Sequence, residues 1–193
     1  MTKIRAAMIG GGIGGFIGEI HRAAMRLDDR FELVAGALSS DATRAMESAK
    51  ELGVRGYESW QALLEKEQDT VDCVVIVTPN DSHAEIATAA LEAGYYVILD
   101  KPMTRTLDEA VSLVGAAQSN NLGIAMTYTY TGYPMVREMR KRILNGEIGK
   151  VRTVSVDYRQ GWLAEPIELD GQKQASWRTD PQKSGAGALG DIG

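Results

Sequence analysis

The chain contains a single cysteine, Cys73, among its 193 residues, so it cannot form an internal disulfide. Cys73 lies in the apolar run CVVIV, where a thiol fills a core, and one unpaired cysteine is typical of a reducing cytoplasm. Histidine is also scarce: His21 and His83 are the only two, and they lie far apart. No Cys/His cluster has the spacing of a metal site. We therefore expect a cytoplasmic protein without a bound metal.

The chain also lacks an excess of basic residues and a long apolar run. Lys and Arg number 21 against 26 Asp and Glu, a formal net charge of -5 at pH 7, whereas nucleic-acid binding needs a concentrated basic face. No stretch approaches the roughly 20 apolar residues that span a bilayer, and the N-terminus enters an apolar run too soon for a secretory signal. The sequence predicts no nucleic-acid partner and no membrane partner.

The most informative stretch is residues 4–27, IRAAMIGGGIGGFIGEIHRAAMRL. Its apolar start predicts a buried strand, and its second half has the apolar period of a helix. Glycine permits positive φ and close approach of an anion, so Gly10, Gly12 and Gly15 fit a dinucleotide loop with the pyrophosphate at the helix start. Gly18 is the alternative third glycine, and a plain tight turn is the alternative interpretation of the whole cluster.

Strand and helix patterns alternate after this point. Strands are predicted at 31–37, 71–78, 95–99 and 123–128, separated by helical patterns that begin with Asp41, Ser82 and Thr106. Such alternation predicts right-handed crossovers and a parallel sheet, with ligands at the carboxyl ends of the strands. The predicted fold class is α/β, with a doubly wound Rossmann domain first.

The residues after the second strand bear on the cofactor. In a dinucleotide fold, a carboxylate here would bind the 2'-hydroxyl of the NAD ribose. This chain has Ser39 and Ser40, with Arg44 one helical turn further on, which could receive the 2'-phosphate of NADP. Asp41 lies close enough to bind NAD instead, so NAD is an alternative cofactor. An exposed position of Arg44 on its helix, without a cofactor role, is an equal alternative.

Polar residues also follow the strands predicted at 71–78 and 95–99. Thr78, Pro79 and Asn80 follow one, and Asp100, Lys101 and Pro102 follow the other. A lysine directly after a buried strand lies at the ligand edge of the sheet, where it could exchange a proton with an alcohol or carbonyl. A surface lysine in a turn is the alternative.

The composition changes at TYTYTGYPM, residues 127–135, which is rich in hydroxyls and aromatics. We place a domain boundary here, with a dinucleotide-binding domain at 1–131 and the start of a second domain at 132–193. A helix is predicted from Pro134 to near Asn145. The alternation in VRTVSVDYR predicts a half-exposed strand over residues 151–159.

Together these features resemble the family of glucose-fructose oxidoreductases and inositol dehydrogenases. The resemblance is carried by IGGG with His21, Thr78-Pro79-Asn80 with His83, Asp100-Lys101-Pro102, GEIGK at 146–150, WRTDP at 177–181 and GALGDIG at 187–193. It implies a Rossmann domain followed by an α+β open-sheet domain, which is incomplete in this sequence, and oligomers formed through that second sheet.

The resemblance also implies residue roles. Lys101 matches the family's catalytic acid/base or its close partner, and Asp191 matches an aspartate that helps to hold substrate and to tune the acid/base group. Members that use NADP carry a serine and a basic residue like Ser39 and Arg44, so NADP is favoured over NAD. His83 is included in the cofactor site, with packing or capping as its alternative. The predicted cofactor-binding set is Gly10, Gly12, Gly15, Ser39, Ser40, Arg44, Thr78, Pro79, Asn80, His83, Asp100 and Lys101.

The predicted function is hydride transfer between NAD(P) and a sugar, polyol or related hydroxy compound. The family pattern continues to a catalytic histidine, and the sequence stops at Gly193 before it. We therefore expect a complete cofactor half and an incomplete catalytic half. The alternative is a non-catalytic dinucleotide-binding protein, either a sensor or a truncated pseudoenzyme.

Overall fold

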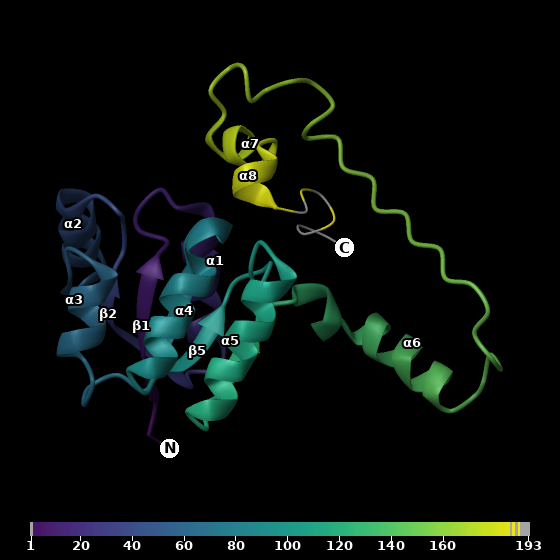
Figure 1. The fold of residues 1–193 in the computed structure, drawn as a ribbon, viewed down its shortest axis with the longest axis horizontal. Helices are drawn as coiled ribbons and strands as arrows, with labels where there is room; N and C mark the ends of the chain where they lie inside the picture. Colours follow the sequence, from purple (N-terminus) through teal and green to yellow (C-terminus); the bar gives the residue numbers. More distant parts are fainter. Residues whose placement is uncertain (1, 186, 188, 190–193) are drawn as a thin grey trace. The chain divides into compact units, whose positions relative to one another are not determined.

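The computed structural model describes residues 2–185, 187 and 189 of the chain (Figure 1). The chain divides into two compact units, Met1–Met126 and Thr127–Gly193. The domain boundary predicted between residues 131 and 132 stays a prediction.

The first unit is built on a six-stranded sheet in the order β3-β2-β1-β4-β5-β6, in which every neighbouring pair is parallel. Its strands are β1 (Ile4–Gly10), β2 (Phe31–Ala37), β3 (Arg55–Gly56), β4 (Cys73–Val77), β5 (Tyr96–Leu99) and β6 (Ile124–Met126). The order reverses between β1 and β4, which is the arrangement of a Rossmann fold. The doubly wound parallel sheet predicted from the alternating patterns is confirmed.

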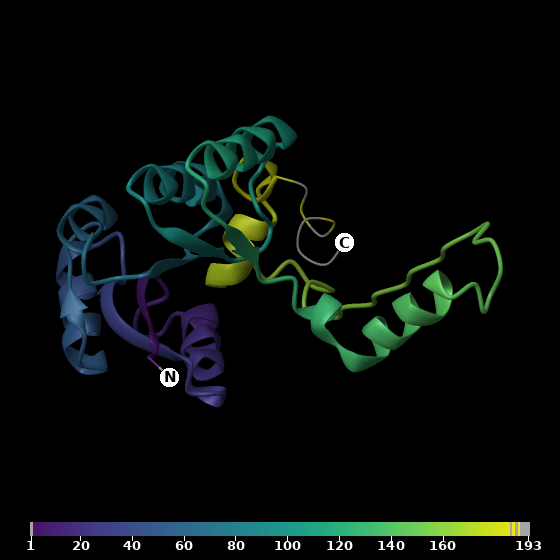
Figure 2. The same ribbon diagram turned by 90° about the horizontal axis from the view of Figure 1, so that it is seen from below.

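Helices cover both faces of this sheet. They are α1 (Phe16–Leu27), α2 (Ala42–Leu52), α3 (Trp60–Lys66), α4 (His83–Glu92), preceded by the 3-10 helix η1 (Asn80–Ser82), and α5 (Leu107–Ser119). Apolar residues of α1 and α2 pack on one face, and those of α3, α4 and α5 pack on the other. Figure 2 shows α1 on one side of the sheet and α4 and α5 on the opposite side. Because β4 lies between the two layers, all five of its residues are buried, as its unbroken apolar run predicts.

The helix ends follow local capping rules. The Asp41 carboxylate accepts the Arg44 amide at 2.8 Å, and Gly53 closes α2 in the left-handed conformation. Thr106 and Glu109 form a capping box at the start of α5. These caps set where each helix begins, and so which residues remain in the turns after the strands.

A buried carboxylate at the end of α3 holds the edge of the sheet. Glu67 is 1% exposed and accepts hydrogen bonds from Arg55 Nε and Nη2, each at 2.7 Å, from the Tyr57 hydroxyl at 2.7 Å and from the Thr70 hydroxyl. Hydrogen bonding to the Arg55 guanidinium is the main cause that lowers the pKa of Glu67 from 4.5 to about 2. The two-residue strand β3 is thus tied to the helix that follows it.

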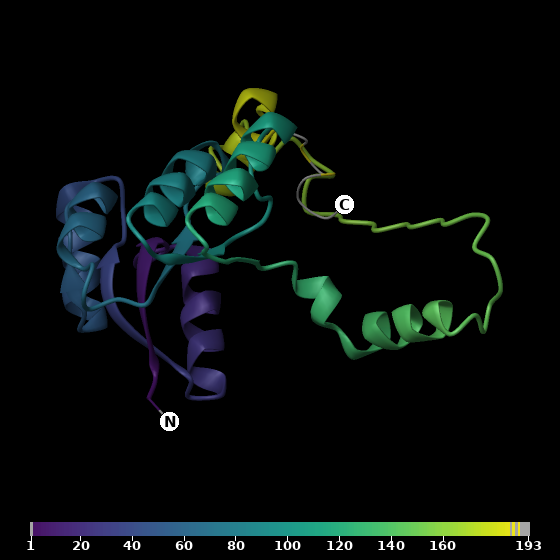
Figure 3. The ribbon, with the colours of Figure 1, turned by 60° about the horizontal axis from the view of Figure 1, so that its bottom comes forward.

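The second unit contains η2 (Thr129–Gly132), α6 (Pro134–Leu144), α7 (Lys173–Arg178) and α8 (Pro181–Ser184). The helix predicted from Pro134 is confirmed. The strand predicted over residues 151–159 is wrong: these residues are exposed and belong to no strand (Figure 3). A strand requires a neighbour that accepts and donates its ladder hydrogen bonds, and alternation in the sequence does not supply one. The formation of oligomers through a sheet of the second domain stays a prediction.

Two kinds of feature are absent from the described residues. Over residues 2–185, 187 and 189, no helix has both the length and the apolar character needed to cross a membrane. In the same part of the chain, no group of three or more His, Cys, Asp or Glu residues could hold a metal ion.

The Glu67 network generates a stability prediction. Because the folded-state pKa of Glu67 lies below its ordinary value of 4.5, its stabilisation is present above that pH and is lost as the pH falls toward about 2. Glu67→Gln should lower the free energy of unfolding at pH 7 by roughly 2–3 kcal/mol. The difference between wild type and variant should shrink as the pH is lowered from 5 toward 2, as measured by urea unfolding.

The matched control is Glu65→Gln, an exposed carboxylate on the same helix, which should leave stability unchanged. A wild-type/Glu67→Gln difference that stays constant across this pH range would contradict the assignment of the acid-sensitive interaction to Glu67.

Candidate functional site

Close contacts in the glycine loop between β1 and α1 leave no room for a side chain at several of its glycines. Gly10, Gly11 and Gly14 have positive φ, and Gly15 is the N-cap of α1. A Cβ added to Gly18 would lie 2.1 Å from the Gly11 carbonyl oxygen, and one on Gly15 would lie 2.9 Å from the Gly12 carbonyl oxygen. Gly18 is therefore the glycine that brings α1 against the loop, and Gly15 closes the loop itself.

Gly12 packs against the turn after β2, and its predicted contact with a pyrophosphate stays a prediction. Its amide donates to the Leu38 carbonyl at 3.0 Å, and a Cβ there would lie 2.6 Å from the same oxygen and 2.7 Å from Ser48 Oγ. The missing side chain thus faces the end of β2 and the helix α2. Ser48, which the sequence analysis missed, is buried and accepts the Ile13 amide at 3.2 Å.

A buried arginine forms a hydrogen bond with the backbone of the loop. Arg22 of α1 donates from Nη1 to the Gly11 carbonyl oxygen, and the same Nη1 atom lies 3.8 Å from the Met8 sulfur. Burial lowers the pKa of this guanidinium below its ordinary value. The exposed residues of the loop are Ile13, Gly14 and Phe16, the last of which begins α1. Nothing lies within 4 Å of a Cβ added to Gly14, so the space at this tip of the loop is open.

The turn after β2 carries the residues predicted to face the ribose. Ser39 Oγ accepts the Asp41 amide at 3.1 Å, while Ser40, Asp41 and Arg44 are exposed. Since Asp41 Oδ1 accepts the Arg44 amide, this carboxylate acts as the cap of α2. The turn therefore presents hydroxyls and one arginine beside the capping carboxylate.

The turns after β4 and β5 lie next to the loop, because parallel pairing brings the carboxyl ends of these strands to one edge. Thr78 Oγ1 accepts the Ser82 hydroxyl at 2.7 Å, Pro79 caps η1 and Asn80 is buried. Lys101 and Asp100 are partly buried, and the Asp100 amide donates to the Ile76 carbonyl at 3.0 Å.

Asp100 also contacts the helix that follows the glycine loop. His21 Nε2 of α1 lies 3.6 Å from Asp100 Oδ1, and both side chains are largely buried. This contact links α1, the helix that follows β1, to the turn that follows β5. His21 was noted in the sequence only as part of the family resemblance, and nothing local in its pattern points to Asp100.

His83, predicted as a cofactor residue with packing as its alternative, is fully buried. Its two ring nitrogens lie 2.9 Å from the Thr78 carbonyl oxygen and 2.8 Å from the Pro102 carbonyl oxygen. The ring therefore contacts the protein through both nitrogens, and direct cofactor contact stays a prediction. Asp191, the second predicted catalytic residue, lies outside the described residues.

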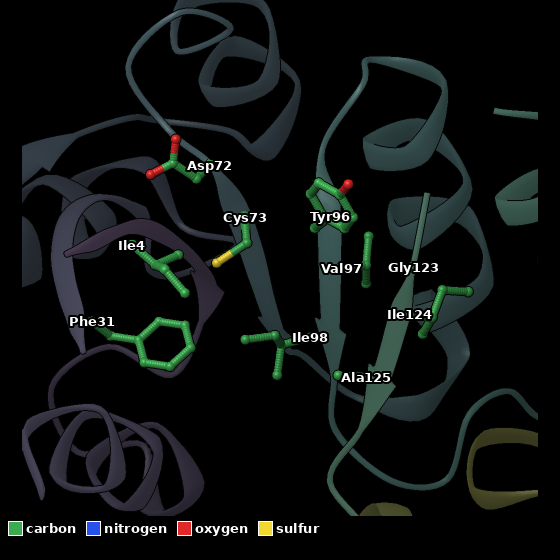
Figure 4. Close-up of a pocket in the computed structure, with 10 residues that line it drawn as sticks. All are labelled: Ile4, Phe31, Asp72, Cys73, Tyr96, Val97, Ile98, Gly123, Ile124 and Ala125. Carbon is green, nitrogen blue, oxygen red and sulfur yellow. The ribbon is translucent and has the colours of Figure 1, made fainter. Parts of the chain in front are cut away.

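An apolar hollow of about 450 Å³ lies elsewhere, on the sheet face beside the starts of the strands. Figure 4 shows Cys73, Tyr96 and Ile98 among its lining residues, together with Ile4 and Phe31. Burial raises the pKa of the Cys73 thiol to about 11, which keeps the thiol protonated and agrees with its predicted place in the core. None of the predicted cofactor residues lines this hollow.

A glycine loop at a helix start, placed at the switch point of a six-stranded parallel sheet, defines a dinucleotide-binding domain of the Rossmann class. The sequence model described as an oxidoreductase family with an NAD-binding Rossmann fold matches residues 4–128, and that of the GFO/IDH/MocA C-terminal domain matches 136–193. The chain belongs to the Gfo/Idh/MocA family of oxidoreductases.

Two curated relatives and one solved structure illustrate this kinship. The uncharacterized oxidoreductase YfiI of Bacillus subtilis is 37% identical over 98% of this chain and 50% of its own length. The levoglucosan dehydrogenase of Pseudarthrobacter phenanthrenivorans is 32% identical over 100% of this chain and 49% of its own. An inositol dehydrogenase homolog from Azotobacter vinelandii, solved with NAD+, superposes with a TM-score of 0.93 at 40% identity, over 100% of this chain and 51% of its own. The chain thus spans about half the length of these relatives.

The glycine contacts generate a paired prediction. In Gly18→Ala the new methyl group meets the Gly11 backbone, which cannot move without opening the loop, so we expect the free energy of unfolding to fall by about 1–3 kcal/mol and NADH affinity to drop. Urea unfolding and NADH fluorescence titration measure the two effects.

Gly115→Ala is the control, because a Cβ at this position in α5 meets nothing within 4 Å. It should leave NADH binding unchanged and raise stability by roughly 0.5–1 kcal/mol. If Gly18→Ala binds NADH as tightly as wild type, the loop packing described here does not govern the site.

Proposed function

We propose that this protein is an NAD(P)-dependent dehydrogenase that moves a hydride between the nicotinamide ring and a CH–OH carbon of a sugar or polyol. The observation that carries the proposal is the convergence, at one edge of the sheet, of the glycine loop with the Asn80 turn and the Asp100–Lys101 turn. Family membership and relatives with names such as levoglucosan dehydrogenase support the chemistry and the substrate class.

The residues of the first unit fit such a cofactor. The open tip of the loop lies at the start of α1, whose N-cap Gly15 provides no side-chain cap, and the helix dipole and first-turn amides there would favour a pyrophosphate. Asn80 and Thr78 in the neighbouring turn would hold the nicotinamide end, and Ser39, Ser40 and Arg44 would hold the adenosine end. When bound, the nicotinamide accepts or donates the hydride.

Lys101 is the residue proposed to handle the proton. Oxidation of an alcohol releases a hydride from carbon and a proton from the hydroxyl, and Lys101 Nζ in its neutral form would take that proton; in the reverse direction the ammonium would return it. Lys101 is the second residue after the end of β5 at Leu99, and the neighbouring Asp100 lies beside His21. Asp191 is proposed, on the family resemblance, to orient the substrate.

We further propose that NADP is preferred over NAD. Asp41, the carboxylate nearest the end of β2, is engaged by the Arg44 amide as a helix cap, and the rest of the turn offers hydroxyls and the Arg44 guanidinium. A 2'-phosphate would find the positive charge of the Arg44 guanidinium here, whereas the carboxylate that a 2'-hydroxyl needs is already used through Oδ1 as the helix cap. The Azotobacter homolog, in contrast, was solved with NAD+.

The NADP preference predicts a result for Arg44→Ala. A charge-assisted hydrogen bond contributes about 1.5–3 kcal/mol, so wild type should bind NADPH at least roughly tenfold more tightly than NADH, and the variant should lose this difference. Arg26→Ala, an exposed arginine on α1, is the control and should keep the preference. Equal or tighter binding of NADH by wild type would refute the NADP assignment and leave the dinucleotide site intact.

The proton-transfer role predicts a separation of catalysis from binding. Lys101→Ala should lower kcat for polyol oxidation by about two to four orders of magnitude while NADPH affinity changes little, since the lysine acts on the substrate proton. Lys66→Ala, an exposed lysine on α3, should behave as wild type. Steady-state assays with inositol, levoglucosan and related polyols provide the measurement. A protein that binds NADPH and turns over none of these compounds would instead support the non-catalytic, dinucleotide-binding alternative.

A further inference from the structure

His83 bridges two turns that carry different parts of the proposed site. It is the first residue of α4 and has no exposed surface. Its Nε2 faces the Thr78 carbonyl oxygen, five residues earlier in the turn that carries Asn80. Its Nδ1 faces the Pro102 carbonyl oxygen, nineteen residues later and adjacent to Lys101.

The chemistry of these contacts restricts where the ring protons lie. Both neighbours are carbonyl oxygens, which only accept hydrogen bonds, so each contact requires an N–H on the imidazole side. A neutral imidazole provides one N–H, so its tautomer decides which of the two oxygens receives a hydrogen bond. The Nδ1 proton matters most for the site, because the Nε2 contact closes a turn within one segment whereas the Nδ1 contact joins two.

The Pro102 carbonyl belongs to no strand ladder, since β5 ends at Leu99 and the next element, α5, begins at Leu107. Unpaired polar groups in buried positions cost about as much as a lost hydrogen bond, so a donor at this position stabilises one placement of the turn. Lys101 belongs to that turn, and Asn80 belongs to the turn on the other side of the ring.

We propose that His83 is a positioning residue, whose Nδ1–H donates to the Pro102 carbonyl oxygen and thereby sets Lys101 relative to the Asn80 turn. The placement of the turn follows from the contacts alone. The consequence for turnover rests on the proposed dehydrogenase function, in which Lys101 must meet the substrate hydroxyl beside the nicotinamide. Misplacement of a reacting group by about 1 Å can cost roughly 100-fold in rate.

Two substitutions distinguish the contact made by Nδ1 from the contact made by Nε2. His83→Asn keeps an amide donor near the place of Nδ1, and His83→Gln keeps one near the place of Nε2. We expect His83→Asn to retain kcat for polyol oxidation within a few-fold, and His83→Gln to lose about 10- to 100-fold in kcat with little change in the KM for NADP+. A role in core packing alone would affect the two variants alike.

Hydrogen exchange gives a second measurement that needs no catalytic activity. Amides of residues 100–106 should exchange faster in His83→Gln than in wild type or His83→Asn, while amides within α4 beyond its first turn remain protected in all three. Faster exchange of residues 100–106 in His83→Gln together with no turnover in wild type would refute the dehydrogenase function and keep the positioning role.

A third measurement uses the wild-type protein, in case a variant fails to fold. The chain has only two histidines, so ¹⁵N-histidine spectra contain two ring systems, and His21→Gln assigns them. We expect a proton on Nδ1 of His83. An unprotonated Nδ1, or equal exchange of residues 100–106 in both variants, would overturn the proposal.

Discussion

Parallel pairing of β1 with β4 is the constraint on which the rest of the first unit depends. It places Gly10 opposite Val77, so the glycine loop and the Thr78 turn leave the sheet side by side. Pairing of β4 with β5 adds Asp100 and Lys101 to the same edge, and pairing of β1 with β2 adds the Ser39 turn. Each parallel connection needs a crossover helix, which is why both faces are covered and why the central strand β4 is apolar and buried throughout.

Turns that leave such an edge carry backbone groups that no neighbouring strand can pair. The structure meets this demand with side chains from helices: Ser48 accepts the Ile13 amide, Arg22 donates to the Gly11 carbonyl, and the His83 ring faces two carbonyls. These side chains are buried, so their partners gain from a low-dielectric surrounding as well as from geometry. The loops at the proposed site are therefore shaped before any ligand arrives, a condition for tight binding of a dinucleotide.

The second unit shows the limit of a local pattern. Residues 134–144 form a helix because each helical hydrogen bond is made within the segment. Residues 151–159 alternate apolar and polar side chains equally clearly, but a strand takes its hydrogen bonds from elsewhere in the chain, and no such pairing is present among the described residues. The same alternation would be stabilised wherever a neighbouring strand was supplied.

The sequence by itself determined the type and order of the elements in the first unit, because apolar period, capping residues and glycine breaks all act over a few residues. It also identified the edge where Gly10, Asn80 and Lys101 meet, since strands joined by helices must run parallel. Only the tertiary structure decided which side chains hold that edge: Gly18 against Gly11, Ser48 against Ile13, His21 beside Asp100, and Arg55 with Glu67. These partners are separated by seven to seventy-nine residues, and their contacts depend on helix placement and strand register, which no local pattern encodes.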